Sequence, residues 1–395
     1  MSWYIEFSGP KFGYMDYVYF LRQLDSARLS GETRLEVDFG KVTFFYPDGM
    51  APFVATTRHL VNNGWGVGVI PPRQKDLIDY WQTVGWLAGI RDEKAPLGTG
   101  STYVPLTPYT SGEELNSFIR SALDLMSKSQ AFSDGVLLAF EWALNEIADN
   151  VLVHAESSEP GWLQMTSYPN KNEVEFVVVD TGRGIRSTLS PAFPDIDSDI
   201  GALMKAIEKG TTRNREIGQG NGLSGTLRIA RSAGGWANLH SGRGLLRLME
   251  GEPQSGEDAP HQGVVVTLTL PTSQPIDIAE ALWGHVPVPA FEMEYLGDHG
   301  IEFTLGAEAT NFGNRSTGER LRFKLRNIMA QHPDEPVIVD FQGVDLMSAS
   351  FADEFIAKLV KELGYVAFFG RFRFRHLSEF SAQTLDTVIG QRMSV

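Results

Sequence analysis

Three polar residues recur at intervals of four near the middle of the chain: Glu146, Asn150 and His154. Because four residues is just over one helical turn, their side chains would share one stripe of a helix, drifting by only about 40° per step. On such a stripe the Glu146 carboxylate can orient and deprotonate a nucleophile that attacks a phosphate. The Asn150 amide oxygen is a neutral ligand of the kind that Mg²⁺ accepts beside water and substrate phosphates. The alternative is an amphipathic helix with a solvated polar face.

Two glycine-containing blocks follow downstream. In the first, Asp180 precedes Gly182 and Gly184. A carboxylate there can accept a hydrogen bond from an exocyclic amine while the backbone turns closely beneath a base, although the block is also typical of a plain turn. The second block comprises Gly218, Gly220, Gly222 and Leu223. Its missing side chains would let backbone N–H groups approach phosphates at a helix N-terminus, but no Gly-Lys-Ser/Thr follows, which excludes a Walker A loop.

The elements that must position these residues can be predicted from the sequence pattern. Residues 132–155 are rich in Leu, Ala, Glu and Val, which predicts one long helix. The β-branched and aromatic run 174–180 predicts a buried strand that ends at Asp180. We further expect a hairpin over 236–248 and a closing strand over 263–271. The long connection between Gly184 and Gly218 predicts a functional lid.

In this order and at these distances, the three blocks resemble the N, G1 and G2 boxes of the GHKL ATP-binding superfamily. The resemblance implies an ATP site in which Glu146 is the catalytic base, Asn150 holds Mg²⁺ and Asp180 reads the adenine amine. The glycines of both blocks and Leu223 would cradle the nucleotide, and the long connection would be the ATP lid. The spacing Glu-x-x-x-Asn-x-x-x-His-Ala is most similar to the anti-sigma-factor serine kinases.

One position departs from the superfamily pattern. Many members have Thr directly after the glycine that opens the closing strand, where it helps to hold the adenine through water. Here Val264 follows Gly263, so this contact is in question, although Thr267 lies on the same predicted strand.

The segments on either side of this region repeat each other. Val-Asp-Phe occurs at 37–39 and again at 339–341, and ten residues after each Asp stand Asp48 and Ser350. Each copy then continues with a predicted helix, over 50–61 or 351–363, and with a predicted strand, over 67–70 or 365–369. The openings 5–7 and 301–303 are both Ile-Glu-Phe. The repeat predicts two small α/β domains. The alternating run 371–375 also has the pattern of a strand with one charged face.

Both flanks resemble the STAS fold of anti-sigma-factor antagonists, which are protein substrates of GHKL serine kinases. In that family a serine in the motif after the Asp-Phe strand is phosphorylated. Aligned by spacing, the N-terminal copy has Asp48 at this position, and the C-terminal copy has Ser350 followed by Phe351 in place of a glycine. The resemblance implies a permanent carboxylate in the first copy and a candidate phosphoacceptor, Ser350, in the second. The alternative for Ser350 is helix N-capping.

The expected fold class is α/β, with a central GHKL α/β sandwich between two small STAS-like α/β domains. The expected boundaries are 1–95 and 299–395 for the STAS-like domains, 113–272 for the ATP-binding domain, and 96–112 and 273–298 for the linkers. A length of 395 residues accommodates three domains. The net charge of −15 argues against a nucleic-acid surface, and we expect no membrane segment. The absence of cysteine excludes disulfides and thiol catalysis and, without a signal peptide, favours the cytoplasm.

Two functions fit this organisation. The first is a Mg-ATP-dependent protein serine/threonine kinase of the anti-sigma-factor type, which acts by partner switching with proteins that bind its STAS-like domains. The alternative is an ATP-gated assembly or signalling ATPase, for example a stress or phage-defence component, with little or no kinase activity. Either protein could form a homo-oligomer. A scaffold with a degenerate site is a third hypothesis, and the presence of both Glu146 and Asn150 argues against it.

Overall fold

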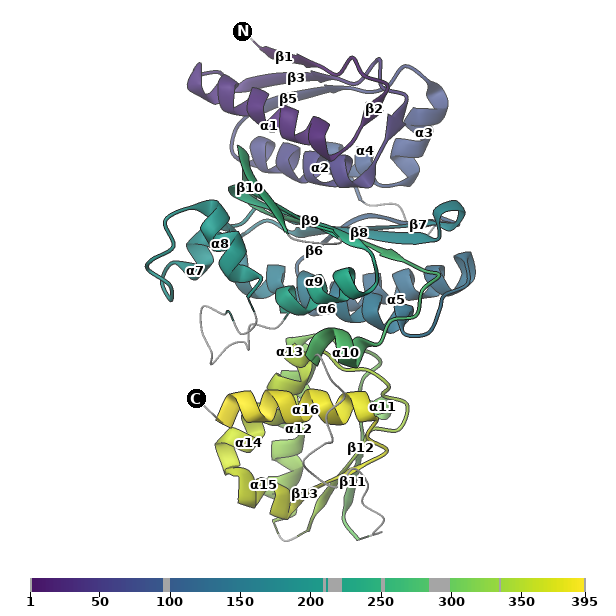
Figure 1. The fold of residues 1–395 in the computed structure, drawn as a ribbon, viewed down its shortest axis with the longest axis vertical. Coiled ribbons are helices and arrows are strands. Elements are labelled where there is room, and N and C mark those ends of the chain that lie inside the picture. Colours follow the sequence, from purple (N-terminus) through teal and green to yellow (C-terminus); the bar gives the residue numbers. More distant parts are fainter. Residues whose placement is uncertain are drawn as a thin grey trace. The chain divides into compact units, whose positions relative to one another are not determined.

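The computed structural model describes residues 2–94, 100–208, 211, 222–249, 253–283, 299–333 and 335–393 (Figure 1). The chain divides into two compact units. Unit 1 contains residues 1–137, 150–207 and 230–275, and unit 2 contains residues 138–149, 208–229 and 276–395. Each unit has a hydrophobic core of its own.

The N-terminal part of unit 1 is a small parallel sheet with helices. Its elements are β1 (Trp3–Glu6), β2 (Lys11–Phe12), α1 (Tyr14–Leu29), β3 (Arg34–Asp38), β4 (Phe44–Phe45), α2 (Pro47–Asn62), β5 (Gly66–Ile70), α3 (Lys75–Thr83) and α4 (Trp86–Arg91). The sheet order is β1-β3-β5, and β2 pairs with β4. Alternate residues of β3 are buried, as expected of a strand with one face on the core. The strands and the helix that the sequence predicts in this copy are confirmed.

A five-stranded antiparallel sheet forms the rest of the unit 1 framework. Its strands are β6 (Tyr103–Tyr109), β7 (Gly161–Tyr168), β8 (Glu173–Asp180), β9 (Trp236–Leu248) and β10 (Gln254–Pro271), in the order β6-β7-β8-β10-β9. The predicted strand ending at Asp180 is confirmed as β8. The predicted hairpin within 236–248 is wrong, because this segment is a single 13-residue strand. Gly242, at φ +57°, pairs with His261 where the β9–β10 register shifts, so the glycine marks a bulge rather than a turn.

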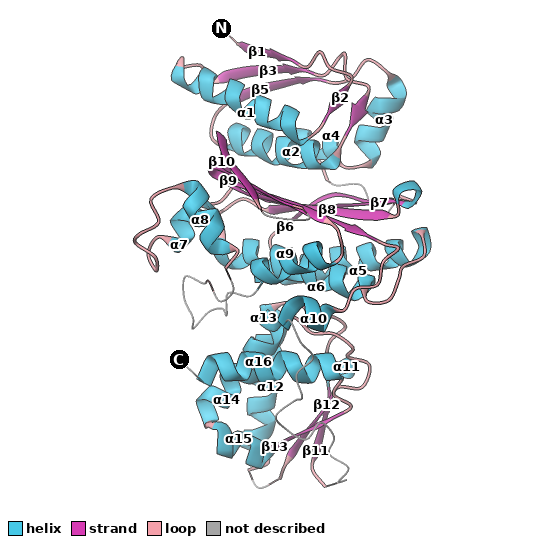
Figure 2. Cartoon of the chain, in the orientation of Figure 1, coloured by secondary structure: helices cyan, strands magenta, loops and turns pink. Residues whose placement is uncertain are grey.

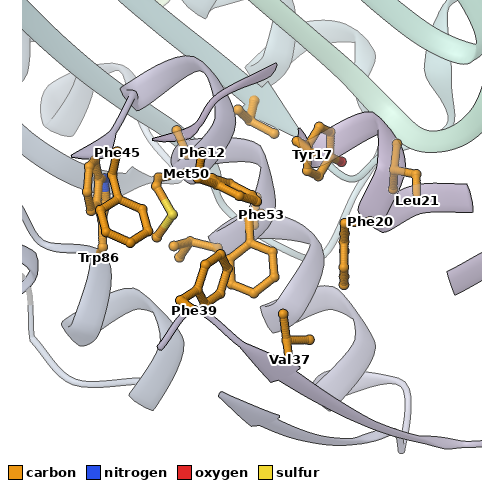
Figure 3. Packing of buried hydrophobic residues seen from close by; sticks show 14 of the residues in the cluster. Phe12, Tyr17, Phe20, Leu21, Val37, Phe39, Phe45, Met50, Phe53 and Trp86 are labelled. Atoms are coloured by element: carbon orange, nitrogen blue, oxygen red, sulfur yellow. The ribbon is translucent and has the colours of Figure 1, made fainter. Parts of the chain in front are cut away.

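The N-terminal helices pack directly on this sheet. Val177, Val179 and Val265 share one buried cluster with residues of α1 and α2, including those shown in Figure 3. The indole Nε1 of Trp86 donates a buried hydrogen bond of 2.8 Å to Gln164 Oε1 on β7. Helix α5 (Gly112–Ser129) packs along β6 and β7 from the other side of the sheet (Figure 2). Both faces of the sheet are therefore covered within unit 1.

The remaining elements before residue 284 are α6 (Val136–His154), α7 (Gly184–Leu189), α8 (Asp199–Ala206), α9 (Gly222–Ser232), α10 (Ile278–Trp283) and the 3-10 turn Pro169–Lys171. Most of α6 and α9 and all of α10 belong to unit 2. The predicted long helix is confirmed as α6, although it starts four residues later than expected. The described part of the predicted lid, up to residue 208, folds as α7 and α8, and α8 packs against β9.

The C-terminal part of unit 2 repeats the parallel arrangement. Its elements are β11 (Ile301–Thr304), α11 (Leu305–Glu308), α12 (Arg315–Gln331), β12 (Val337–Asp340), α13 (Ala349–Ala352), a π-helical segment (Asp353–Ala357), α14 (Lys358–Leu363), α15 (Tyr365–Arg371), β13 (Phe372–Arg375) and α16 (Glu379–Met393). The sheet order is β11-β12-β13. The predicted strand over 365–369 is wrong, because this short apolar run forms α15. The strand lies in the charged alternating run, where Phe372 and Phe374 are buried.

Equivalent backbone contacts in the two copies support the internal repeat. Gly40 N donates to Asp38 Oδ1 at 2.6 Å, and Gln342 N donates to Asp340 Oδ1 at 2.8 Å. In the loops before the second helix of each copy, Tyr46 N donates to the Phe12 carbonyl at 2.8 Å. The matching bond, from Ser348 N to the Phe312 carbonyl, is 3.0 Å long. The colinear repeat is therefore present in strand order and in loop geometry.

Candidate functional site

Helix α6 carries the three polar residues of the first motif. Glu146 is almost fully buried, with 3 % of its surface exposed, whereas Asn150 and His154 are half-buried. Burial raises the pKa of Glu146 to about 7, and nearby Arg315 opposes this rise. A carboxyl whose pKa lies near neutral pH is well matched to general-base chemistry.

Asp180 lies at the end of β8 in a buried turn, with 4 % of its surface exposed. Its Oδ1 accepts a hydrogen bond of 2.8 Å from Gly182 N. Burial raises the pKa of Asp180 to about 6, while the amides of Gly182 and Val264 favour the charged form. Gly263, at φ +93°, lies so close to the Asp180 backbone that a Cβ there would overlap it. The result is a carboxylate with a closely approaching backbone, which fits a purine amine.

The departure at Val264 is not offset by Thr267. Val264 pairs directly with Asp180, so the two side chains share one face of the sheet. Thr267 pairs with Val177, which belongs to the core shared with the N-terminal helices on the other face. Thr267 does lie on the same strand, as predicted, but residues three apart on a strand point to opposite faces, so its side chain does not take the place of the missing threonine.

The first glycine block is held against the end of α6. A Cβ at Gly182 would overlap the carbonyl of Ala155, and Gly184, at φ +78°, would bring a Cβ to 2.9 Å from Ser241 Oγ. The same Ser241 hydroxyl accepts a 2.9 Å bond from Ile185 N. These two glycines therefore allow the tight turn that follows Asp180.

The second glycine block is only partly described. Gly218 and Gly220 lie outside the described residues, whereas Gly222 begins α9 and Leu223 is half-buried. A Cβ at Gly222 would overlap Glu146 Oε2. The absence of a side chain at Gly222 therefore lets the start of α9 approach the Glu146 carboxylate.

Ser350 and Glu146, separated by 204 residues, are in contact within unit 2. Ser350 Oγ donates to Glu146 Oε2 at 3.3 Å, and Ser350 N donates to Oε1 at 3.3 Å. Ser350 is not the N-cap of α13, so the capping alternative is wrong. That role belongs to Ser348, which accepts from Phe351 N at 3.0 Å. Ser348 Oγ also donates to the Gly313 carbonyl at 2.7 Å and is buried.

Two charged residues at this contact were not singled out in the sequence. Arg315, at the start of α12, donates from Nη2 to Ser350 Oγ at 3.3 Å and lies 3.4 Å, from Nε, from Asp149 Oδ2. Asp149 follows Glu146 by three residues, so helical spacing alone could have placed both on one face. The pairing of Arg315 with this face depends on tertiary structure and has no sequence signal.

A buried hydrogen-bond chain joins the N-terminal helices to the Asp180 turn. The Tyr17 hydroxyl, on α1, lies 2.9 Å from Thr56 Oγ1 on α2 and 2.6 Å from His261 Nδ1 on β10. His261 Nε2 lies 3.2 Å from the Asp180 carbonyl oxygen. Burial lowers the pKa of His261 to about 3, so its ring is neutral at physiological pH. The sequence did not predict these hydrogen bonds, because the residues that form them come from distant segments.

The polar residues of this site fit ATP with a magnesium ion. The buried Asp180 carboxylate suits the adenine amine, and Asn150 offers one neutral oxygen to a cation that takes most of its remaining ligands from phosphates and water. Among the described residues no group of three or more His, Asp or Glu side chains could hold a metal ion. No helix in the described ranges is long and apolar enough to cross a membrane.

Comparisons with known families agree with this geometry. Residues 135–274 match the model described as histidine kinase-, DNA gyrase B-, and HSP90-like ATPase. Residues 317–381 match the model of a STAS-like domain of unknown function (DUF4325). A search of curated proteins finds no significant match. The chain therefore contains a GHKL-type α/β sandwich and a C-terminal STAS-like domain. The match of the central domain supports an ATP-binding regulatory protein of the GHKL type.

Proposed function

We propose that this protein is a Mg-ATP-dependent serine kinase of the anti-sigma-factor type and that Ser350 of its own C-terminal domain is a phosphoacceptor. The observation that carries the proposal is the 3.3 Å hydrogen bond from Ser350 Oγ to Glu146 Oε2. A hydroxyl donating to a buried carboxylate is the arrangement that general-base activation of a serine requires. The N-terminal copy, with Asp48 at the corresponding position, acts as a second STAS-like domain that cannot be phosphorylated there.

Each residue of the site has a defined role in this proposal. Asp180 accepts from the adenine amine, and the backbone of the glycine blocks, with Leu223, surrounds the phosphates. Asn150 is the protein ligand of Mg²⁺, which neutralises charge on the phosphates when bound. Glu146 takes the proton of Ser350 Oγ as the bond from Oγ to the γ-phosphorus forms. The bond from that phosphorus to the bridging oxygen breaks, and ADP leaves.

Arg315 supplies positive charge at the reacting hydroxyl. Its Nη2 donates to Ser350 Oγ at 3.3 Å, close enough to stabilise negative charge that develops on a transferred phosphoryl group. After transfer, phosphoserine would add about −1.5 to −2 charges next to Glu146 and Asp149. Repulsion among these buried acids would loosen the C-terminal domain and change which protein partners, or second copies of this chain, it can bind.

Phosphopeptide mapping tests the proposal. After incubation of the full chain with Mg-ATP, mass spectrometry should find one phosphate on Ser350, and Ser350→Ala should abolish it. Ser316→Ala is the control, because Ser316, at the start of α12, donates from Oγ to Asn314 Oδ1, and no contact joins it to Glu146 among the described residues. Phosphate on another residue, or none while a separate protein becomes phosphorylated, would remove Ser350 from the mechanism.

An ATP-gated assembly or signalling ATPase, for example in stress response or phage defence, is the second candidate. It is favoured by the burial of Glu146, since Ser350 covers both carboxylate oxygens. Nucleotide that displaced this contact would free the C-terminal domain without any transfer. Sedimentation with a non-hydrolysable ATP analogue separates the two functions. A change of assembly state in a protein that shows no transfer to any substrate would favour the gate.

A further inference from the structure

A cavity lies in unit 1, away from the residues assigned to the nucleotide. It has a volume of about 700 Å³ and lies between the starts of α1 and α2 and the strands β8, β9 and β10. This volume falls within the range of small-molecule sites in proteins, roughly 300–1,000 Å³. Neither Asn150 nor Asp180 lines it, so it is separate from the candidate ATP site.

Four carboxylates line this cavity, those of Asp16, Asp48, Glu173 and Glu175, and the site depends on Asp48 and Glu175. Glu175, on β8, is 6 % exposed and accepts from the Tyr168 hydroxyl at 3.3 Å. Asp48, at the start of α2, has a buried Oδ1 without a hydrogen-bond partner among the described residues, although the nearby amides of Tyr14 and Gly49 favour its charged form. The cations that line the cavity, Lys11, Lys171 and Arg247, are all exposed, and the described residues place no buried cation beside the pair. Two acids that share one cavity repel each other.

Burial is the larger cause of the raised pKa of both acids, and repulsion from nearby carboxylates adds to it. Burial, and then the charge of Asp48, raise the pKa of Glu175 to about 8. Burial also raises the pKa of Asp48 to about 6, and the charge of Asp16 adds to the rise. The amides of Gly49 and Tyr14 and the charge of Arg247 oppose it. A positive group beside Asp48 and Glu175 would stabilise both carboxylates in their charged form and so lower both pKa values.

The walls of the cavity are aromatic. Tyr14, Tyr46, Tyr168 and Trp236 line it. The buried Tyr14 hydroxyl has no hydrogen-bond partner in the described part of the chain. Two of these rings already carry exposed cations at the rim, with Lys171 Nζ 5.1 Å from the Tyr168 ring centre and Arg247 Cζ 5.8 Å from that of Trp236. Aromatic faces beside carboxylates are the surroundings that bind organic cations in proteins.

We propose that this cavity binds a small organic cation of the arylalkylammonium class. Its ammonium group faces the carboxylates of Asp48 and Glu175, which both line the cavity. Its carbon skeleton contacts the tyrosine and tryptophan rings. Because Asp48 stands at the position that Ser350 occupies in the C-terminal copy, the N-terminal copy uses the same loop to recognise a ligand instead of accepting phosphate. The proposal does not depend on kinase activity.

Calorimetry on the full chain with phenethylammonium tests this site, and 2-phenylethanol serves as the neutral analogue of similar shape. Measurements at about pH 8.5, above both raised pKa values, keep most of the Asp48 and Glu175 carboxylates charged. We expect saturable binding of the ammonium ion. The alcohol should bind at least about tenfold more weakly, because it lacks the charged hydrogen bond. Saturating ADP should leave this binding unchanged.

Matched variants locate the cation. Asp48→Asn and Glu175→Gln should each lower the affinity for phenethylammonium by about tenfold or more. Glu113→Gln, which removes the same charge from an exposed position on α5, should leave the affinity unchanged. Circular dichroism melting checks that each variant folds, and either acid variant alone is sufficient for the test. Absence of saturable binding, equal affinity for the alcohol, affinity unchanged in a folded acid variant, or competition by ADP would each overturn the proposal.

Discussion

Replacing Glu146 with glutamine separates the chemical role of this carboxylate from its effect on folding. Glutamine keeps the shape and a hydrogen-bond acceptor for Ser350 but cannot take a proton. A general base contributes roughly 10²–10⁴-fold to a rate, so we expect phosphoryl transfer to fall by about that factor. ATP affinity should be almost unchanged, because the base acts in the chemical step.

The pKa of about 7 gives this prediction a pH dependence. The transferring form has Glu146 ionised, which is about one tenth of the protein at pH 6 and about nine tenths at pH 8. The single-turnover rate of the wild type should therefore rise about tenfold over this interval and then level off. Residual transfer in Glu146→Gln should lack this rise.

Whereas the transfer rate rises with pH, the stability that Glu146 contributes to the fold should fall with pH. Because the folded-state pKa of Glu146 lies above its ordinary value of 4.5, the folded protein binds this proton more tightly than the unfolded chain. Its contribution therefore destabilises the fold progressively as pH rises from about 4.5 to about 7, by up to about 3 kcal/mol. Glu146→Gln removes this effect, so the variant should melt at a higher temperature than the wild type at pH 8 and gain little at pH 4.5.

Rapid-quench transfer assays and thermal melts measure both effects on the same samples. Glu141→Gln is the control, because burial raises the pKa of Glu141 to about 6 on the same helix, but no contact joins its carboxylate to Ser350 among the described residues. Its transfer rate should stay near that of the wild type. Transfer by Glu146→Gln within tenfold of the wild type, or a flat wild-type pH profile, would refute the role of Glu146 as the base.

Three further predictions concern the nucleotide. Asp180→Asn should weaken ATP by about 1.5–3 kcal/mol, the scale of a charged hydrogen bond, and calorimetry that finds equal ATP and GTP affinity in the wild type would remove the adenine assignment. Asn150→Ala should make ATP binding insensitive to Mg²⁺ in the same measurement, and a retained Mg²⁺ dependence would exclude this ligand. Tyr17→Phe should cost about 1 kcal/mol or more of stability in denaturant melts and should also weaken ATP, because Tyr17 holds His261 against the Asp180 carbonyl. Unchanged ATP affinity would confine Tyr17 to a structural role.

Long periodic segments were predictable from the sequence, and short ambiguous ones were not. The run that forms α6 has enough residues for its helical period to be unmistakable, and β8 is β-branched and bounded by turn residues. The run 365–369 is too short for periodicity to decide between helix and strand, and it forms α15. Gly242 resembles a turn signal, but a bulge uses the same conformation, and only the pairing of β9 with β10 distinguishes them.

The candidate site divides in the same way. Glu146 and Asn150 share a helix, so local spacing was sufficient to propose them together. The position of Thr267 on the wrong face could also have been inferred, since it lies three residues from Val264 on one strand. In contrast, Arg315 reaches Ser350 and Asp149 through packing between distant segments. No local sequence pattern predicts these contacts of Arg315.

The core shared by the N-terminal helices and the central sheet restricts how this protein can evolve. Leu106, Trp162 and Val177 are buried in one cluster with residues of α1 and α2. A chain shortened to begin after residue 94 would present these side chains to water as an apolar patch, which promotes aggregation. The N-terminal copy can therefore be lost or exchanged between genes only together with polar substitutions on β6, β7 and β8.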